Sequence, residues 1–528
     1  MENIKVLIQT NRYQTPVTQE LLDSLPSEVA EQLMDCLTNI QFIKNLISPD
    51  RLCYKDLPRD ERGAAIVDIT NPPILEDADY FRQAALHYQK HGCYTFLKPN
   101  SNPNSEFRKF WDEERRRCWE GLIRPSDGAW ISGFNYWFLN YQPMMVNKIT
   151  EGKRKAVRVE SFPFIQEGNV WRYYYLFNAR EQGHHAIELA KRGCAKSYSL
   201  SSIMGHNLIL GESEESKRRV ITVLTAYQKE YLSDNKDGTL SKFKPAINFS
   251  FSHTPFPHLM LKNSPNEMSW QMGYKDEYGI ERGSLNQVLA VSAKDDSEKL
   301  RGKRGWILFE EMGSFKGLLS LYDITRKSVE DGDYTFATMY LVGTAAEDES
   351  DFSSAKTLLY YPEAYNILSV ENVYDKPKQG KPTFGYFFPS YINRAGCYNK
   401  DGVSDVVKAL IEILMQRHKA KYSADPKSVL RVIAEDPITP AEAIIKVKSA
   451  FFPVTALTER LQQLDTDVHS FDDVYIGKLV MNKSGEVEFK PTSDEPIRKY
   501  GVENDTPGAI EIFELPEKDR SGKVPDTR

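Results

Sequence analysis

Hydrophobic and polar residues alternate along this chain in the manner of an α/β protein. Between about residues 180 and 345, short apolar runs alternate with stretches whose apolar residues recur at helical spacing. The predicted strands are His185–Leu189, Val220–Ala226, Gln287–Ser292, Trp306–Phe309 and Thr335–Val342. A connection of roughly 60 residues, which includes Asn248–Pro255, separates the second strand from the third and is interpreted as an insertion. This alternation predicts a sheet covered by helices.

The regions on either side of this core follow other patterns. The N-terminal part is largely helical and polar, and the C-terminal part mixes strands with helices. The predicted elements are helices in Gln19–Ile47, Glu106–Trp119 and Val403–Lys421, a loop at Pro99–Ser105, a Pro-punctuated segment at Asp436–Pro440, a strand at Val474–Met481 and a polar linker at Glu517–Asp526.

Three features of these regions each allow a functional and a structural interpretation. Arg115-Arg116-Arg117 could face phosphate groups, or it could be a solvated helix face balanced by neighbouring acids. The aromatic runs Trp130–Pro143 and Trp171–Phe177 could stack on a nucleotide base, or they could be core. Gln182 lies near the second run and could read the edge of an adenine.

Composition narrows the class of protein. A chain of 528 residues with 41% hydrophobic and 27% charged residues is an ordinary globular protein, expected to contain about two to four domains. The net charge of −6 is no global signature of nucleic-acid binding, so any DNA contact would need a local patch or an assembled ring. The cysteines are scattered without CxxC pairs, which indicates a reducing compartment and argues against a structural zinc site: Cys36, Cys53, Cys93, Cys118, Cys194 and Cys397. No signal peptide or membrane-spanning apolar run is present.

The stretch 185–197 carries the first candidate chemistry. An apolar strand leads into a small-residue loop, and Lys196-Ser197 follows at the start of a helical stretch. Backbone N–H groups of such a loop can cradle a polyphosphate, the Lys can cap it, and the Ser hydroxyl can reach Mg²⁺. The loop proper is Arg192-Gly193-Cys194-Ala195. Ala190 and Ala195 occupy the two positions where glycine is usual.

Two further strands supply what a nucleotide-hydrolysing site needs. Trp306–Phe309 is apolar and ends in Glu310 and Glu311, which predicts one acid that orients Mg²⁺ and a second that activates water. The strand before Thr344 ends in a small polar turn that could lie beside the γ-phosphate. An arginine is expected to neutralise the transition state. Arg192 lies inside the loop, but Arg301, in a basic loop ahead of the acidic strand, is the better candidate for reaching a neighbouring subunit; Arg301 and Arg304 could equally form a basic surface turn.

With these motifs in order, the chain resembles the large terminase subunit of tailed bacteriophages, and most of all that of the crAss-like phage group. The resemblance covers about residues 105 to 515. It rests on Arg192–Ser197 as a variant Walker A, Leu308–Met312 as Walker B with the catalytic Glu, and Gly343-Thr344-Ala345 as the coupling motif. Ser132–Pro143, Tyr386–Tyr391 and Pro437–Pro453 also look like those proteins.

The resemblance implies a P-loop ATPase of the ASCE type with a mostly parallel central sheet. Its cofactors would be ATP and Mg²⁺, and its partners double-stranded DNA, the portal protein, the small terminase subunit and further copies of itself in a ring, in the host cytoplasm. Lys196 would bind the β- and γ-phosphates, Ser197 and Glu310 the Mg²⁺, and Glu311 would activate water. Thr344 would couple hydrolysis to movement, and Arg301 would act in trans.

The expected domains are a helical N-terminal extension (1–105), the ATPase domain (106–400), and a C-terminal subdomain with a linker (401–528). Two departures from the family pattern stand out, namely the missing glycines of Walker A and Glu310 where Asp is common. No apolar strand that ends in a metal-binding Asp follows residue 515, so no nuclease activity is expected of this chain. Asp465, Asp467, Asp472 and Asp473 are interpreted as solvated acids.

Two other functions remain open. The chain could be a non-catalytic structural or portal-docking protein whose degenerate loop no longer binds nucleotide. It could also be a helicase-like ATPase, although the further nucleic-acid motifs of that class are not found in the sequence.

Overall fold

A computed structural model describes residues 8–61, 63, 65–149, 156–212, 219–233, 237–296, 300–344, 352–376, 381–423, 425, 428–444, 475–483, 485, 487–494 and 508–512. The chain divides into two compact units. The first comprises residues 1–377 and 382–449, and the second comprises residues 378–381 and 450–528.

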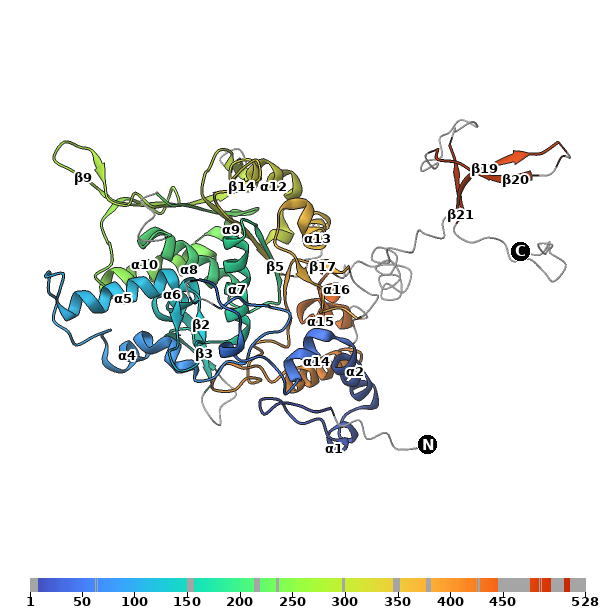
Figure 1. Ribbon diagram of the computed structural model, residues 1–528, viewed down its shortest axis with the longest axis horizontal. Helices are drawn as coiled ribbons and strands as arrows, with labels where there is room; N and C mark the ends of the chain where they lie inside the picture. The colour runs from blue at the N-terminus through green and yellow to red at the C-terminus, as the bar shows by residue number, and fades with distance from the viewer. Residues whose placement is uncertain are drawn as a thin grey trace. The chain divides into compact units, whose positions relative to one another are not determined.

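An eight-stranded sheet forms the centre of the first unit (Figure 1). The strand order is β18-β5-β15-β12-β6-β11-β8-β7. In that order the strands are Tyr386–Phe388, Ala186–Ala190, Met339–Gly343, Trp306–Glu310, Ile221–Ala226, Gln287–Ser292, Ser269–Met272 and Met260–Ser264. The strands from β18 to β11 run parallel, whereas β8 and β7 are antiparallel to their neighbours. The predicted α/β fold with a mostly parallel sheet is therefore confirmed for the described residues.

Every predicted strand of the core belongs to this sheet, with ends that differ by a few residues. The exception in length is Thr335–Val342, where the structure has a short strand β14 (Tyr334–Thr335) and a separate β15 that begins at Met339. All residues of β5, β12 and β15 are buried. Strands covered on both faces carry continuous apolar runs, which is why the sequence pattern identified them.

Helices pack along this sheet and against one another. The helix α8 (Lys196–Ile209) contacts β6, β11 and β8 and packs against α10 and α6. The helix α7 (Glu167–Glu181) contacts β5 and β18, and α13 contacts β5 and α12. The other helices in the region from α4 to α13 are α4 (Gln83–His91), α5 (Glu106–Glu120), α6 (Gly133–Tyr141), α9 (Lys229–Leu232), α10 (Thr239–His253), α11 (Ala293–Asp296), α12 (Leu318–Arg326) and α13 (Ser353–Tyr360).

The two aromatic runs lie in the core. Every residue of α6 is buried, and so are the aromatic residues of α7 from Trp171 to Tyr175. The ring of Trp137 lies 5.0 Å from that of Tyr141 and 6.1 Å from that of Phe256. These contacts favour the core interpretation over base stacking, because the rings are already packed against other rings.

The arginine run of α5 is paired within its own helix. Arg116 and Arg117 both contact Glu113, at 2.8 and 3.0 Å, and Arg115 lies 3.6 Å from Asp112. Residues three and four apart are neighbours on a helix surface, so such pairs form locally. The structure therefore favours the solvated helix face.

The predicted insertion between β6 and β11 is largely ordered. It contains α9, α10 and the antiparallel strands β7 and β8, which extend the main sheet beyond β11. A two-stranded hairpin, β9 (Tyr274–Lys275) with β10 (Glu281–Arg282), extends from it at the left of Figure 1. The helix α10 packs along α8, so the insertion lies against the helix that follows the loop Arg192–Ala195. The other two-stranded sheets described are β1 (Leu122–Ile123) with β2 (Trp130–Ile131), β3 (Met144–Ile149) with β4 (Ala156–Ser161), β13 (Glu330–Asp331) with β14, and β16 (Val370–Glu371) with β17 (Thr383–Phe384).

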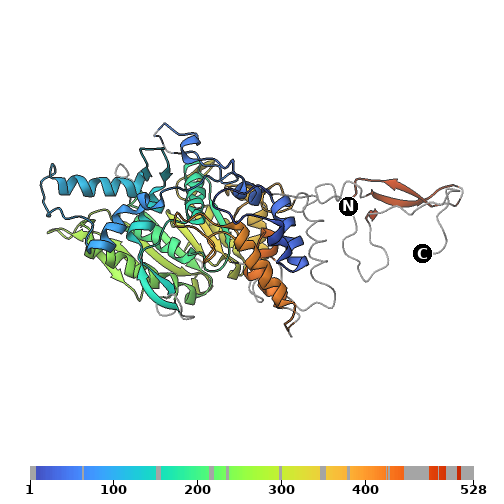
Figure 2. The same cartoon turned by 90° about the horizontal axis from the view of Figure 1, so that it is seen from below.

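The N-terminal helices and the segment after residue 400 belong to the same unit as the sheet. The helix α14 (Val406–Ala420) packs against α2 (Ser27–Asn39) and α3 (Gln41–Ile47), and Figures 1 and 2 both show α14 beside the N-terminal helices. The further helices of these parts are α1 (Gln19–Asp23), α15 (Ser428–Glu435) and α16 (Pro440–Ala443). The boundaries expected at 105 and 400 therefore fall inside the first unit.

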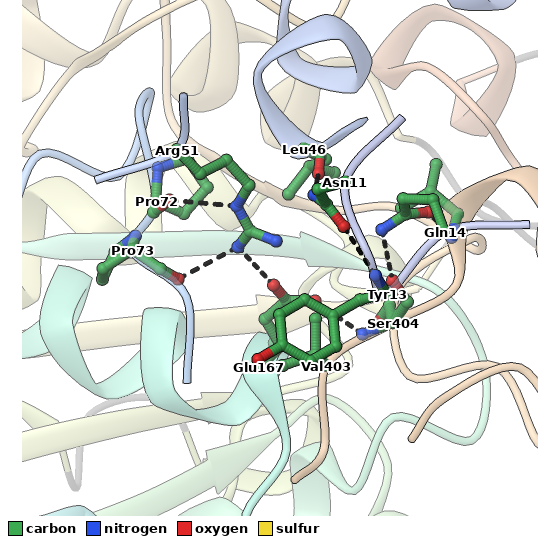
Figure 3. Close-up of polar contacts among 12 residues, drawn as sticks. Asn11, Tyr13, Gln14, Leu46, Arg51, Pro72, Pro73, Glu167, Val403 and Ser404 are labelled. Atoms are coloured by element: carbon green, nitrogen blue, oxygen red, sulfur yellow. Dashed lines mark hydrogen bonds and ion pairs between the residues drawn. The ribbon is translucent and has the colours of Figure 1, made fainter. Parts of the chain in front are cut away.

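A buried polar network links segments on either side of these two positions (Figure 3). Arg51 and Glu167 form an ion pair of 2.5 Å in which both side chains are fully buried. The other carboxylate oxygen of Glu167 accepts the N–H of Ser404 at 2.8 Å, and the carbonyl of Ser404 accepts the amide of Gln14 at 2.9 Å. Removing one partner of a buried ion pair strands a charge in the interior. The N-terminal residues, α7 and the segment after 400 are thus held as one unit.

The second unit contains a small antiparallel sheet. The strand β19 (Tyr475–Met481), at the position predicted from the sequence, pairs with β20 (Val487–Pro491) and β21 (Ile510–Ile512). The acids at 465, 467, 472 and 473 and the polar stretch 517–526 lie outside the described residues.

Two further findings concern the chain as a whole. Over the described residues, none of the helices has both the length and the apolar character needed to cross a membrane. The six cysteines are all free, and none is joined in a disulfide.

Candidate functional site

The loop between β5 and α8 has the local conformation of an anion-binding turn. Gly193 and Ala195 both have left-handed backbone angles, with φ of 74° and 62°. Ala195 is the N-cap of α8, which begins at Lys196. The N–H groups of the first helical turn have no partner within the helix, and the helix dipole makes this end favourable for negative charge. The loop therefore has a backbone that could hold an anion, despite the alanine at its second glycine position.

The two acids at the end of β12 lie against this loop. The Ser197 hydroxyl donates to Oε1 of Glu310 at 2.8 Å. The ammonium of Lys196 lies 3.2 Å from Oε1 of Glu311. Because β5 and β12 run in the same direction through the sheet, their carboxyl ends reach the same edge.

Thr344 completes the group from the strand between these two. β15 pairs with β5 on one side and with β12 on the other. Its next residue, Thr344, donates from both its N–H and its hydroxyl to Oε2 of Glu311, at 3.2 and 3.1 Å. Glu311 itself has a left-handed backbone, with φ of 50°, which turns its side chain out of the strand direction. The carboxylate of Glu311 thus has one oxygen on Lys196 and the other on Thr344.

The electrostatics of the two acids differ. Burial, together with the negative charge of Glu311, raises the pKa of Glu310 to about 7. Burial also acts to raise the pKa of Glu311, but the ammonium of Lys196 and the hydrogen bonds from Thr344 outweigh it and lower that pKa below its ordinary value. Burial opposes the charge of Lys196, yet Glu311 and the other nearby groups raise the pKa of its ammonium. The site therefore keeps Lys196 charged and Glu311 ionised, while Glu310 lacks a full counter-charge.

The residues around Glu310 fit a magnesium ion. Its second carboxylate oxygen, Oε2, is buried and has no hydrogen-bond partner among the described residues. An unpartnered buried carboxylate oxygen beside a serine hydroxyl matches the oxygen ligands that Mg²⁺ prefers, and a cation there would remove the cost of burying the charge. Glu310 and Ser197 are the two side chains that would hold the ion.

A cavity of about 460 Å³ lies over the loop. Its walls come from the loop, from the acidic and threonine strand ends, and from β3 and the insertion. They include Met145, Arg192, Gly193, Cys194, Ala195, Lys196, Ser197, Tyr198, Tyr231, Lys242, Glu311 and Thr344. Lys242 and Tyr231 come from the insertion, so this region contributes to the wall of the site. A volume of this size is in the range of small-molecule sites.

Two predicted site residues lie elsewhere. Gln182 lines a separate cavity with His184 and Glu330, on the side where β5 begins. Arg301 is exposed in the turn before β12, again on the side where the strand begins. In parallel strands the beginnings and the ends lie at opposite edges of the sheet. The structure therefore brings neither residue to the loop of its own chain.

The sequence did not lead us to predict a buried ion pair that contacts the loop. Arg172 on α7 and Glu188 on β5 form an ion pair of 2.6 Å, with side chains that are 1% and 0% exposed. Tyr340 on β15 donates its hydroxyl to the same carboxylate at 2.5 Å. The detectable signal was Glu188 itself, a carboxylate in an otherwise apolar strand, since such a residue is almost never fully buried without a partner.

Comparison with known proteins gives the following result. No protein-family model matches the chain, and no curated protein matches it. Among solved structures, the large terminase ATPase domain of Thermus phage P74-26 and an arginine-to-alanine mutant of that domain are similar to it. Each has a TM-score of 0.33 and 11% identity, and the similarity covers 50% of this chain and 92% of that domain. A likeness this low carries no argument about function.

Proposed function

We propose that this chain is an ATPase that hydrolyses ATP to ADP and phosphate with the help of Mg²⁺. The observation that carries the proposal is the convergence of five side chains from three strand ends: Lys196, Ser197, Glu310, Glu311 and Thr344. Lys196 is a cation at the start of a helix. The hydroxyl of Ser197 lies beside the carboxylate of Glu310, whose second oxygen has no partner among the described residues. The hydroxyl of Thr344 contacts the second carboxylate, Glu311. Phosphoryl transfer needs this set, because its catalysis is mostly positioning and charge neutralisation.

Each residue has a definable task in this proposal. The N–H groups at the start of α8 and the Lys196 ammonium bind the phosphate oxygens. Ser197 and Glu310 hold Mg²⁺, which neutralises charge on the β- and γ-phosphates when it is bound. Glu311 orients the attacking water and accepts its proton. Thr344 contacts Glu311 directly and so senses changes at the γ-phosphate.

We further propose that hydrolysis moves double-stranded DNA into a viral procapsid. Support for this finer assignment comes from the order of the three motifs and their surroundings, which resemble a terminase large subunit. On this proposal the partners are DNA, the portal protein, the small terminase subunit and further copies of the chain in a ring, in the host cytoplasm. Arg301 then acts on the nucleotide of a neighbouring copy.

Calorimetric titration of Mg²⁺-ATP into the unchanged protein tests the ATPase proposal, with the Lys196→Ala variant alongside. We expect heat of binding for the former and none for the latter. The matched control is Lys262→Ala, which removes a lysine of the edge strand β7 that pairs with Glu267, and this variant should bind as before. Absence of heat with the unchanged protein would favour the non-catalytic docking protein instead.

Turnover measured with and without double-stranded DNA and procapsids tests the motor. We expect the rate to rise when both are present. Stimulation by single-stranded DNA, together with strand separation, would favour the helicase-like ATPase.

A further inference from the structure

The buried guanidinium of Arg172 contacts the loop between β5 and α8. Arg172 donates from Nε and Nη2 to the carboxylate of Glu188, at 2.8 and 2.6 Å. The ring of Phe388 lies 4.9 Å from the guanidinium carbon. This arrangement fixes the plane of the guanidinium, because a two-point pair with a carboxylate sets its orientation.

The donors of Arg172 that remain are directed at the loop and its supports. Nη1 donates to the carbonyl oxygen of Cys194 at 2.9 Å and to the hydroxyl of Ser199 at 3.0 Å. It also donates to the side chain of Asn169 at 3.0 Å, and Nη2 lies 3.2 Å from the sulfur of Cys194. One rigid group thus joins α7, β5, the loop and α8.

The contact with the Cys194 carbonyl determines the direction of the next N–H. The peptide between Cys194 and Ala195 is planar and trans, so its C=O and its N–H point in opposite directions. The carbonyl points to the buried Arg172, whereas Cys194 and Ala195 also line the cavity over the loop. The N–H of Ala195 is therefore turned away from Arg172.

This orientation is unfavourable for alanine by itself. Ala195 has φ of 62° and ψ of 25°. Glycine adopts such angles freely, but the Cβ of alanine disfavours them. Rotation of the peptide plane would let Ala195 return to a negative φ, and it would also turn the N–H away from the phosphate site. A fixed donor on the carbonyl opposes that rotation, because the rotation would break the hydrogen bond.

We propose that Arg172 is a positioning residue, which holds the Cys194–Ala195 peptide with its N–H toward the bound phosphate and thereby replaces the missing second glycine of the loop. This inference deepens the proposed nucleotide site and rests on it. Arg172 touches no ligand and acts through the loop backbone. The ligand class is the polyphosphate of a nucleoside triphosphate.

The test compares Arg172 with Arg51. Each is a buried arginine paired with a glutamate, and each pair includes one residue of α7. Arg172→Lys keeps the positive charge beside Glu188, but a single ammonium cannot serve both the carboxylate and the Cys194 carbonyl. Arg51→Lys makes the same change in the Arg51–Glu167 pair, in which Arg51 donates to the carbonyls of Pro72 and Pro73 and to Glu167. For each variant, the Kd of Mg²⁺-ADP and of Mg²⁺-ATP is measured by calorimetry and the Tm by thermal unfolding.

We expect both variants to lower the Tm and only Arg172→Lys to weaken nucleotide binding, by about tenfold to a hundredfold, the range for one charge-assisted hydrogen bond. In the Ala195→Gly background the loss from Arg172→Lys should shrink, because glycine does not oppose the required φ. Equal affinity of Arg172→Lys and the unchanged protein would overturn the proposal. So would an equal loss in Arg51→Lys, since the effect would then be general to the fold.

A second variant covers the case in which Arg172→Lys does not fold. The double change Arg172→Met with Glu188→Gln removes both buried charges together and keeps an acceptor for Tyr340, so no charge is stranded. It should also bind nucleotide weakly, and binding at the original affinity would again overturn the role of Arg172. Failure of the unchanged protein to bind any nucleotide would instead refute the proposed function.

Discussion

Replacing Glu311 by glutamine separates nucleotide binding from hydrolysis. The amide has nearly the shape of the carboxylate, so its oxygen can still accept the hydrogen bonds from Thr344. It cannot accept a proton from water. Removal of a general base typically costs about 10²- to 10⁴-fold in rate, which corresponds to about 3–5 kcal/mol of barrier. We therefore expect kcat to fall by this factor.

Binding should respond in the opposite direction. In the structure the ammonium of Lys196 is engaged by Glu311 at 3.2 Å, so a phosphate must compete with this carboxylate for it. A hydrogen bond between charged groups contributes about 1.5–3 kcal/mol, and losing the competitor should make binding tighter by about tenfold or more. Because Lys196 is buried, its charge would then have the phosphate as its main partner.

The assay follows phosphate release under saturating Mg²⁺-ATP and nucleotide affinity by calorimetry. Glu371→Gln is the control, since Glu371 is an exposed carboxylate on β16 and its loss should change neither quantity. Unchanged turnover in Glu311→Gln would refute the assignment of Glu311 as the base. Weaker nucleotide binding would refute the competition for Lys196.

Three other changes have expected outcomes. Ala195→Gly relieves about 1–2 kcal/mol of left-handed backbone strain, and it costs about 0.5–1 kcal/mol because glycine makes the unfolded chain more flexible. The Tm without nucleotide should therefore rise slightly. A fall in the Tm would contradict the strain argument. His206 is buried, and burial lowers its pKa from 6.5 to about 4. Between these two pH values the unfolded chain binds more protons than the folded chain, so stability is lost as the pH falls through this range. The loss is on the order of 3 kcal/mol. His206→Gln, which can still donate to the carbonyl of Cys118, should flatten denaturant-measured stability over that window, and an unchanged slope would show that another group is responsible. Arg301→Ala should leave nucleotide affinity of the isolated chain unchanged, because the strand β12, which is about 13 Å long, lies between Arg301 and Glu310 along the chain. It should reduce turnover only in the assembled ring, and equal loss in the isolated chain would contradict action in trans.

The sequence pattern was sufficient to predict the strands that are buried on both faces, because such strands are rich in apolar residues. β5, β12 and β15 are buried along their whole length and mostly apolar, and each of them is followed by a loop or polar residue that lies at the site. The prediction that Lys196, Ser197, Glu310, Glu311 and Thr344 act together could be made because the ends of parallel strands share one edge. Their roles in hydrolysis remain predictions until the variants are measured.

Spacing along the chain could not place Gln182 and Arg301. Both lie close in sequence to a site strand, but both precede it, and a strand carries its two ends to opposite edges of the sheet. The same limit applies to the contacts that hold the first unit together. The Arg51–Glu167 pair and the bond from Ser404 join segments far apart in sequence, and no local composition reports such contacts.

The sequence by itself therefore determined the α/β class, the buried strands and the residues that follow them, because periodicity and burial are local properties of the chain. Only the tertiary structure decided the orientation of the loop and the partner of each charge. Arg172, Glu188 and the Cys194 carbonyl come from α7, β5 and the loop. A left-handed alanine at position 195 persists only where distant elements supply the donor that holds it.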